Sequence, residues 1–360
     1  MLNCIWTGYP QFKLKDEQGI PKNKIATYPW LQAPYMFRGK VGLDRWKWLN
    51  REWAWLAHDT LDKHVASQIK KPTVVVALSA SGELAGRAAQ TIGGFHICDR
   101  GSTHILFQER VLREEYKRWG CEFPGIDPRI IKKELVEYEN SDRITVPSEF
   151  VKQSFIQMGI PENKLSKVVY GARLDRFYKT GDPSHDLFRV LWVGGVSIRK
   201  GFMYALRAFQ SIKHPNKEFL VVGHVSQEIR YLLKEERLEN VRFAGQVPNS
   251  ALPDIYSKSH VFIIPSIEEG LAMVQGEALA CGCPVIATKN TGSEEIITDS
   301  KEGFIIPSQS SEAIAEKFQI ILDKPELRSS MSELAIKRVQ SLGGWDSYGN
   351  DYKKVVNMLF

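Results

Sequence analysis

The fold is decided by a stretch in the C-terminal third of the chain, HVFIIPSIEEGLAMVQGEALACGCPVIATK (His260–Lys289). Its first segment, HVFIIPS, is apolar and predicts a buried strand, and CPVIATK at the other end predicts a second one. Between them, LAMVQGEALACG has a helical pattern that Gly282 ends as a C-cap. A strand, a helix and a strand in this order form a βαβ unit with parallel strands.

The same alternation runs along the rest of the chain. The runs FRVLWVGG, EFLVVGH and VRFAGQV, together with HVFIIPS, CPVIATK and EGFIIPS, predict a six-stranded doubly wound parallel sheet in the second half. In the first half, TVVVALS, GGFHICD, DRITVPS and KVVYGA predict a further sheet. We therefore predict an α/β fold of two Rossmann-like domains facing a cleft, over residues 1–170 and 189–344, joined by a linker over residues 171–188.

Composition narrows the class of protein. The chain has 360 residues, of which 43% are hydrophobic and 25% charged, as in globular proteins with two domains. No apolar run reaches the ~18 residues of a membrane span, and the N-terminus has no signal-peptide pattern. The five cysteines form no pair of CxxC motifs; Cys281 and Cys283, in an apolar run, are interpreted as buried thiols, and the alternative is metal or redox use. These features predict a cytoplasmic protein.

Positive charge is concentrated near the N-terminus. The net charge is +6, and residues 1–70 contain eleven Lys and Arg against six Asp and Glu. Such a region can meet nucleic acid, an anionic membrane or an anionic substrate. No recognised nucleic-acid module is present, so we expect no nucleic-acid partner.

Aromatic residues interleave with these cations in LDRWKWLNREWAWLAHDTLDKH. Helical spacing predicts a core stripe formed by Leu43, Trp46, Leu49, Trp53 and Leu56. The tryptophans at positions 48 and 55 fall on another face, beside Arg and Lys. They favour peripheral contact with a membrane, at its inner face, or a carbohydrate platform, and the alternative is packing on the second domain.

Two carboxylates flank the start of the helix in the opening stretch. Ligands bind at the carboxyl ends of parallel strands, and Glu269 lies in the loop that follows such a strand, with Glu277 eight residues later. The backbone amides near Gly270 to Met273 stand at the positive end of the helix and can hold an anion. Hydroxyl groups at both ends and an anion between them are the features of a nucleotide-diphosphate sugar. The alternative is a helix-start acid and a surface carboxylate.

A second anion site is predicted where VLWVGG is followed by VSIRKG. Gly194 and Gly195 allow the chain to turn, and Arg199 and Lys200 then open the next helix. Cations together with free amides at a helix start favour anions. The alternative is a solvated pair of cations at a helix start.

These segments resemble the retaining family-4 glycosyltransferases of GT-B fold, which belong to glycosyl transferases group 1. PSIEEGLAMVQGEALACGCPVIATKNTGSEEIITDSKEGFIIP resembles the family's signature with its Glu-x7-Glu motif, and VGGVSIRKG resembles its phosphate loop. ENSDRITVPSEF and the residues after it resemble the end of the family's first domain. The resemblance covers roughly residues 137–307, nearly half the chain.

The resemblance implies a metal-independent hexosyltransferase acting in polysaccharide biosynthesis. It would move a sugar from a nucleotide-diphosphate sugar, commonly a UDP-sugar of the UDP-glucose type, to a glycan or lipid-linked saccharide. No DxD-like motif ends a strand, so we expect no metal and no cofactor. The C-terminal helix, residues 345–360, would pack back on the first domain. The alternatives are a GT-B epimerase or glycan phosphorylase, or a sugar-nucleotide-binding protein without turnover.

The resemblance also implies roles for single residues. Lys200 would neutralise the donor diphosphate, Glu277 would bind the ribose hydroxyls, and Glu269 would hold the transferred sugar. The backbone amides implied on sugar and phosphate are those of Gly270, Leu271 and Ala272.

The sequence departs from the family at one position of the phosphate loop. Gly195 stands where many relatives have an arginine, and we expect Arg199 to supply that charge. The base of the donor is expected near His224 and Val247, because both follow strands at the same edge of the sheet.

A histidine from the first half completes the predicted site. In FHICDRGSTHILFQERVLREE, His104 opens a helix, whose dipole keeps a histidine neutral. Relatives place a histidine against the donor sugar, and we assign this role to His104 rather than to His96, which lies in mid-strand. The residues expected on the acceptor or sugar side are Asp99, Arg100 and Ser102, with Ser81 from the loop LSASGE.

Overall fold

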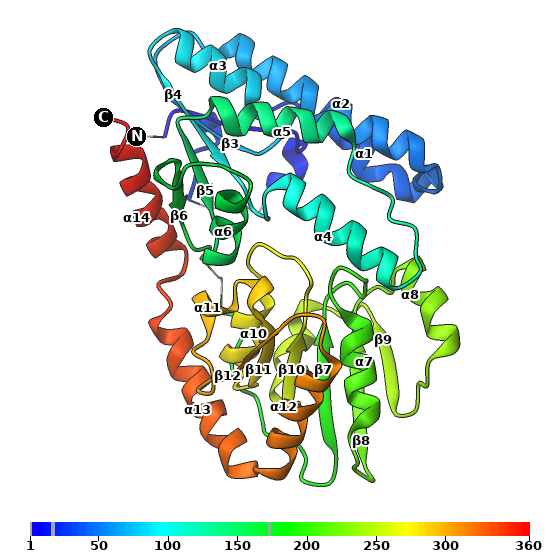
Figure 1. Cartoon of the computed structure of the whole chain (residues 1–360). Helices are drawn as coiled ribbons and strands as arrows, with labels where there is room; N and C mark the ends of the chain where they lie inside the picture. Colours follow the sequence, from blue (N-terminus) through cyan, green and yellow to red (C-terminus); the bar gives the residue numbers. More distant parts are fainter. Residues whose placement is uncertain (1, 16–18, 172–173) are drawn as a thin grey trace. The chain divides into compact units, whose positions relative to one another are not determined.

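The computed structural model describes residues 2–15, 19–171 and 174–360, and contacts divide the chain into two compact units. The first unit comprises residues 1–100 and 126–145 with Leu359, and the second comprises residues 101–125 and 146–358 with Phe360. The helices and strands of both are labelled in Figure 1. The predicted domain limits and the linker over 171–188 stay predictions, and residues 172 and 173 of that linker lie outside the described part.

The second unit is built on a six-stranded sheet in which all neighbouring strands pair in parallel. Its order, β12-β11-β10-β7-β8-β9, is the doubly wound order, and the chain changes direction between β7 and β10. All six strands lie where the sequence predicts them. Their bounds are β7 Phe188–Val193, β8 Lys217–Val222, β9 Val241–Gly245, β10 Val261–Ile264, β11 Val285–Thr288 and β12 Gly303–Ile306.

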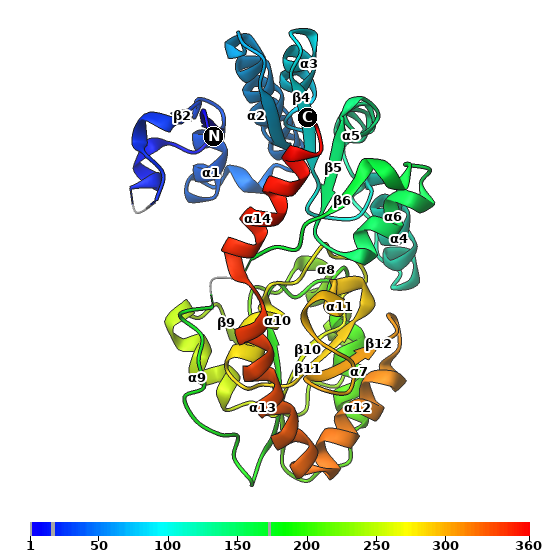
Figure 2. The same ribbon diagram turned by 90° about the vertical axis from the view of Figure 1, so that its left-hand side faces the viewer.

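Helices cover both faces of this sheet (Figure 2). Trp192 of β7 packs with α7 and α12, while the next residue back, Leu191, packs with α9, α10 and part of α13. This alternation buries apolar side chains on both faces, as a doubly covered parallel sheet requires. The helices are α7 Phe202–Ser211, α8 Gln227–Leu232, α9 Leu252–Ser257, α10 Val274–Ala280, α11 Ser293–Ile296, α12 Ser311–Asp323 and α13 Pro325–Ser341.

Three elements from the middle of the sequence also belong to the second unit. They are α4 (Ile105–Arg118), α6 (Glu149–Gln157) and the short strand β6 (Leu165–Lys167). The strand predicted from KVVYGA begins where β6 ends, so that prediction is displaced along the chain. The C-terminal helix α14 (Gly344–Asn357) is counted with this unit, and its packing on the first domain stays a prediction.

The first unit contains a parallel sheet in which β4 lies between β3 and β5. These strands match the predicted runs TVVVALS, GGFHICD and DRITVPS. A separate parallel pair, β1 and β2, lies near the N-terminus. The bounds are β1 Ile5–Thr7, β2 Ile25–Thr27, α1 Gln32–Phe37, α2 Lys47–Gln68, β3 Val74–Leu78, α3 Glu83–Thr91, β4 Phe95–Asp99, α5 Pro128–Asn140 and β5 Arg143–Val146.

The core stripe predicted along α2 is wrong at three positions, since Leu43 lies in a short 3-10 turn before the helix and Trp46 and Leu56 are exposed. Trp46 precedes the helix as its N-cap residue and is 46% exposed, and Leu56 is 39% exposed. Trp48 is 66% exposed, in line with its predicted separate face, whereas Trp55 lies under the guanidinium of Arg129 at 5.1 Å. Because the helix begins at Lys47, Trp46 does not lie on the face that helical spacing predicted for it.

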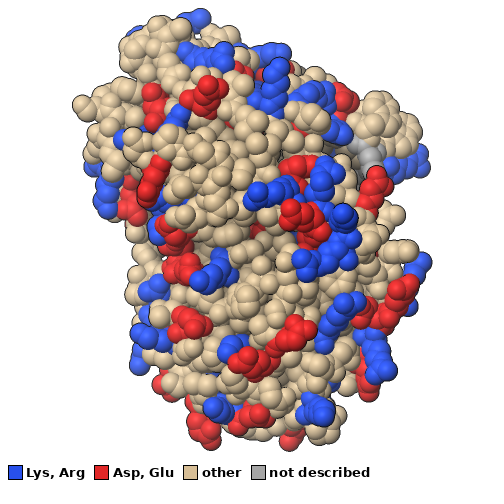
Figure 3. Space-filling view, in the orientation of Figure 1, with Lys and Arg blue, Asp and Glu red and all other residues tan. Residues whose placement is uncertain are grey.

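Charges on the face drawn in Figure 3 are mixed, with basic and acidic side chains interspersed. Many charged side chains of the described residues are paired, such as Arg207 with Glu236 and Lys258 with Asp254. No helix within the described ranges has the length and apolar character needed to cross a bilayer.

Candidate functional site

A pocket of about 290 Å³ opens at the carboxyl ends of β7 and β10, where the strand order reverses. This is the position at which doubly wound sheets bind ligands. The pocket brings together five residues that the sequence singled out, Gly195, Lys200, Glu269, Leu271 and Ala272. The remaining lining residues are Trp192, Val193, Gly194, Ile263, Ile264, Met273 and Val274.

An ion pair between Lys200 and Glu269 lies at this pocket. The second carboxylate oxygen of Glu269 accepts a hydrogen bond from Ser266 Oγ at 3.0 Å. The side chains of Lys200 and Glu269 are 26% and 17% exposed, so a ligand can reach both groups. A cation and an oriented carboxylate therefore stand side by side, as recognition of a phosphate next to a hydroxylated group requires.

The two loops that carry this pair are held together through their backbones. Gly201 has φ +73°, and a Cβ at this position would lie 2.1 Å from the carbonyl oxygen of Pro265. The amide of Ile267 donates to the carbonyl of Arg199 at 2.8 Å. Only glycine combines this conformation with so close an approach, so Gly201 fixes Lys200 opposite Glu269.

The helix after Glu269 starts later than predicted. It begins at Val274 rather than Leu271, and Gly282 follows it with φ +70°, which confirms the predicted C-cap. The amides predicted to bind donor thus lie in a turn, and that of Ala272 donates to Thr291 O at 3.0 Å. The carbonyl of Gly270 accepts from Ser148 Oγ at 2.6 Å.

Glu277 lies within α10, where it does not line the pocket described above. The hydroxyl of the buried Tyr256 donates to Glu277 Oε2 at 3.2 Å. Burial raises the pKa of the Glu277 carboxyl, and the Tyr256 hydrogen bond opposes that rise. Glu277 is therefore a partly buried carboxylate with a fixed orientation, and its predicted contact with ribose stays a prediction.

Glu268 is the functional candidate that the sequence did not reveal. Its carboxylate is fully buried and accepts hydrogen bonds from Ser102 Oγ at 2.6 Å and from Thr103 Oγ1 at 2.8 Å. Gln108 Nε2 donates at 2.9 Å, and Arg199 Nε lies 3.0 Å away. The pattern IEEG shows two acidic residues, but no local signal says which of them is buried.

His104 occupies the predicted helix start as the N-cap residue of α4, and it is 2% exposed. Its Nδ1 accepts from the amide of Leu106 at 3.2 Å, and its own amide donates to Ser154 Oγ at 2.9 Å. The ring meets Phe155 edge to face. A ring nitrogen that accepts from an amide carries no proton, which agrees with the neutral imidazole predicted.

His96 lies within a strand, as predicted. The ring is buried in β4, with Nε2 3.5 Å from a carboxylate oxygen of the equally buried Glu137. A Cβ on Gly86 would lie 2.3 Å from this ring, so the neighbouring helix packs directly against it. The preference for His104 as the site histidine remains a prediction.

Three of the residues predicted on the acceptor side belong to the first unit. Arg100 donates to Glu134 Oε1 at 2.8 Å, and burial raises the pKa of Asp99. Ser81 Oγ lies 2.8 Å from Nδ1 of His58. The segment DRGSTH is thus divided: Asp99 and Arg100 belong to the first unit and the residues after them to the second.

Neither of the two residues predicted near the donor base lines the pocket. Val247 follows β9 and packs against the core of the second unit, and it is not among the lining residues. His224 follows β8 and is exposed. Both lie beyond strands at the same edge of the sheet, and their contact with a base stays a prediction.

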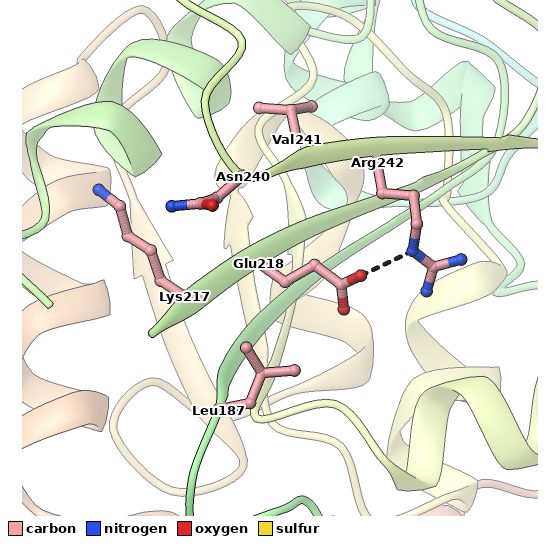
Figure 4. Close-up of a pocket in the computed structure, with 6 residues that line it drawn as sticks. All are labelled: Leu187, Lys217, Glu218, Asn240, Val241 and Arg242. Atoms are coloured by element: carbon pink, nitrogen blue, oxygen red, sulfur yellow. Dashed lines mark hydrogen bonds and ion pairs between the residues drawn. The ribbon is translucent and has the colours of Figure 1, made fainter. Parts of the chain in front are cut away.

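A second hollow, drawn in Figure 4, lies at the amino ends of β8 and β9. Its charges are used within the fold: Lys217 donates to the carbonyl of Ile212 at 2.6 Å. Glu218 accepts from Arg189 at 2.5 Å and from Arg242 at 2.6 Å. This hollow is at the wrong end of the strands for a ligand site and has a structural explanation. Its lining residues are Leu187, Lys217, Glu218, Asn240, Val241 and Arg242.

Comparison with known proteins relates the second half of the chain to a known family. Residues 179–338 match the family Glycosyl transferases group 1. The predicted family is therefore confirmed at the level of group 1, over the part of the chain that carries the pocket. The assignment to retaining family 4 stays a prediction.

Curated relatives agree with this class. An uncharacterized glycosyltransferase of Methanocaldococcus jannaschii is 26% identical over 61% of this chain and 60% of its own length. The amylovoran biosynthesis glycosyltransferase AmsK of Erwinia amylovora is 23% identical over 61% of this chain and 52% of its own length. The capsular polysaccharide biosynthesis glycosyltransferase CapM of Staphylococcus aureus is 28% identical over 54% and 56%. The matches to the first relatives thus span about half to two thirds of those proteins.

Solved structures show the same fold. Sucrose-phosphate synthase from Thermosynechococcus elongatus has a TM-score of 0.69 at 23% identity, covering 86% of this chain and 80% of its own. Anabaena HepE in complex with UDP has a TM-score of 0.64 at 16% identity, covering 83% and 82%. These similarities confirm the predicted α/β class with the GT-B fold.

Proposed function

We propose that this protein is a retaining glycosyltransferase that uses a nucleotide-diphosphate sugar, of the UDP-glucose type, as donor. The acceptor would be a glycan or lipid-linked saccharide in polysaccharide biosynthesis. The observation that carries the proposal is the Lys200–Glu269 pair in a pocket at the reversal of strand order. A crystal structure of HepE with UDP-glucose and the roles in the names of AmsK and CapM support this choice of donor and process.

The proposed donor lies with its diphosphate at Lys200 and its sugar at Glu269. In the absence of donor these two groups neutralise each other, and a donor replaces their ion pair with a cation–phosphate contact and carboxylate–hydroxyl hydrogen bonds. Glu277 receives the ribose hydroxyls. Because Lys200 and Glu269 are only partly exposed, these exchanged contacts form in a region of reduced screening.

The reaction breaks the bond between the anomeric carbon and the diphosphate oxygen. The acceptor oxygen forms its new bond on the same face of the sugar, and its proton passes to the departing diphosphate. Negative charge therefore develops on the diphosphate, where Lys200 stabilises it in the transition state. The chain's own groups suffice for this scheme, which requires neither a metal ion nor another cofactor.

Peripheral contact with the inner face of the membrane is the second part of the proposal. Trp46 and Trp48 expose 46% and 66% of their surface, and residues 1–70 hold most of the excess positive charge. Exposed tryptophans beside cations suit an anionic lipid surface, from which a lipid-linked acceptor is presented.

A donor-binding panel tests the proposed function. UDP-, GDP-, ADP-, CDP- and dTDP-linked sugars are titrated against the purified chain by thermal shift, with EDTA and then with Mg²⁺. A ligand at 100 times its Kd stabilises the fold by about 2.7 kcal/mol. Binding of a UDP-sugar in EDTA that Lys200→Ala abolishes is the expected result, and no shift with any donor, with or without metal, would overturn the proposal.

Product analysis then separates the alternatives. Release of UDP together with an acceptor-linked sugar that keeps the anomeric configuration of the donor supports the proposal. Conversion of the donor sugar without any acceptor indicates an epimerase, and dependence on inorganic phosphate indicates a phosphorylase. Tight binding without turnover on any saccharide acceptor indicates a sugar-nucleotide-binding protein.

A further inference from the structure

The carboxylate of Glu268 joins parts of the second unit that are far apart in the sequence. Its Oε1 accepts from Ser102 Oγ at 2.6 Å and from the amide and hydroxyl of Thr103 at 3.2 and 2.8 Å. Its Oε2 accepts from Gln108 Nε2 at 2.9 Å and lies 3.0 Å from Arg199 Nε. All of the donors come either from residues 102–108 or from the phosphate loop, and each oxygen faces donors only.

The charge of this group is maintained although it is buried. Burial raises the pKa of Glu268, but Arg199 and the hydrogen bonds from Ser102, Gln108 and Thr103 outweigh it, so that the pKa lies below its ordinary value. A buried ionised carboxylate persists only where its partners are fixed. The ionised Glu268 carboxylate therefore also fixes the positions of the side chains that stabilise it.

Both sides of this network lead directly to the proposed site. Glu268 immediately precedes Glu269, and Arg199 immediately precedes Lys200, so two adjacent ion pairs connect the same two loops. On the other side, the hydrogen-bonded residues 102, 103 and 108 surround the position of His104 at the start of α4.

We propose that Glu268 is a positioning residue that holds the His104 turn in register with the Arg199–Lys200 loop and Glu269. This inference rests on the proposed function. Glu268 does not line the pocket, so it acts through the groups that it orients rather than on the donor itself. Fixed spacing between the sugar side and the diphosphate side matters because a misplacement of 1 Å costs about 100-fold in rate.

The chain provides a matched control on the same helix. Glu115 near the other end of α4 is equally buried, and its oxygens accept from Trp119 Nε1 at 2.7 Å, Tyr204 OH at 2.8 Å and Gln309 Nε2 at 2.6 Å. It anchors α4 to the second unit without contacting the phosphate loop or the His104 turn. Losing either carboxylate should thus cost comparable stability, but only Glu268 should affect catalysis.

The experiment compares Glu268→Gln with Glu115→Gln. In either orientation of the glutamine side chain, its NH₂ group faces hydrogen-bond donors that now contact a carboxylate oxygen. Half of the network is therefore lost, while the volume of the side chain stays the same. Donor turnover and Kd for free UDP are measured well below the melting temperature of both variants. We expect Glu268→Gln to lower kcat by about 10- to 100-fold and to change the Kd for UDP by less than about threefold, and Glu115→Gln to leave kcat near wild type.

The possible outcomes are distinguishable. Wild-type protein that binds no nucleotide sugar overturns the proposed function and this inference together. A wild type that turns over, with kcat of Glu268→Gln within about twofold of it or lowered equally in Glu115→Gln, overturns the positioning role alone. If Glu268→Gln does not fold, Gln108→Ala removes one donor to Oε2 and should lower kcat by a smaller factor at unchanged UDP affinity; an unchanged kcat there also overturns the positioning role.

Discussion

Gly201→Ala is expected to destabilise the second unit and to weaken donor binding, because this glycine joins the two loops of the pocket. An alanine at φ +73° costs about 1–2 kcal/mol in backbone strain. Its Cβ would also lie 2.1 Å from Pro265 O, whereas ordinary contact begins at 3.4 Å, so the loops must separate by 3.4 − 2.1 = 1.3 Å.

That separation has a defined cost. It lengthens the hydrogen bond from Ile267 N to Arg199 O, now 2.8 Å, beyond hydrogen-bonding distance and removes about 1 kcal/mol more. The sum is about 2–3 kcal/mol, which lowers the melting temperature of a unit of this size by about 4–12 °C. The same movement draws Lys200 away from Glu269, so the Kd for UDP should rise.

Gly245→Ala provides the control. Gly245 has φ +68°, but no atom lies within 4 Å of its Cβ position, so only the backbone strain of about 1–2 kcal/mol applies. Calorimetry and UDP titration of both variants separate the cost of backbone strain from the cost of the close approach to Pro265. Equal losses of stability in the two variants, or unchanged UDP affinity in Gly201→Ala, would refute the role assigned to this close approach.

Three further predictions concern other contacts of the chain. Burial raises the pKa of Glu277, so the contribution of this one group to the stability of the unliganded fold is greatest below the ordinary carboxyl pKa and is lost as pH rises through the raised value. The proposed contact between the Glu277 carboxylate and the ribose should make nucleotide binding strengthen over the same window in isothermal titrations, and Glu277→Gln should abolish this dependence. Gly270→Ala would place a Cβ 1.8 Å from Gly101 O, so calorimetry should show a loss of more than about 2 kcal/mol, and wild-type stability would contradict this packing. Trp48→Ala should leave the melting temperature unchanged yet weaken sedimentation with vesicles containing phosphatidylglycerol, whereas equal sedimentation would count against membrane contact.

Much of the second unit could be predicted from its sequence because its strands are short apolar runs bounded by glycine and polar residues. A continuous apolar run of this kind indicates a strand whose two faces are both buried, and all six strands lie where these runs predict them. The turn at Gly282 was predictable for a local reason, since its positive φ suits glycine. The neighbourhood of Lys200 and Glu269 followed from the rule that ligands meet the carboxyl ends of parallel strands.

Features that depend on distant partners could not be predicted. Glu268 and Glu269 are chemically identical neighbours, and only the contacts with Ser102 and Gln108, more than 150 residues away, decide that Glu268 is the buried one. The prediction of a core stripe along α2 was wrong for a different reason. Helical spacing includes Trp46 only if the helix extends to it, and the helix begins at the following residue.

The division of the chain between its two units affects how this protein can be recombined with its relatives. The second unit includes residues 101–125, and two buried carboxylates, Glu115 and Glu268, join that segment to α7 and to the loop after β10. A chimera cut only in the 171–188 segment would exchange these partners for foreign ones. To exchange the first unit for that of a relative, the junctions should fall near positions 100, 126 and 145, so that the α4 segment stays with the second unit. Exchange of residues 1–170 as a single contiguous piece would require compensating changes at both carboxylates.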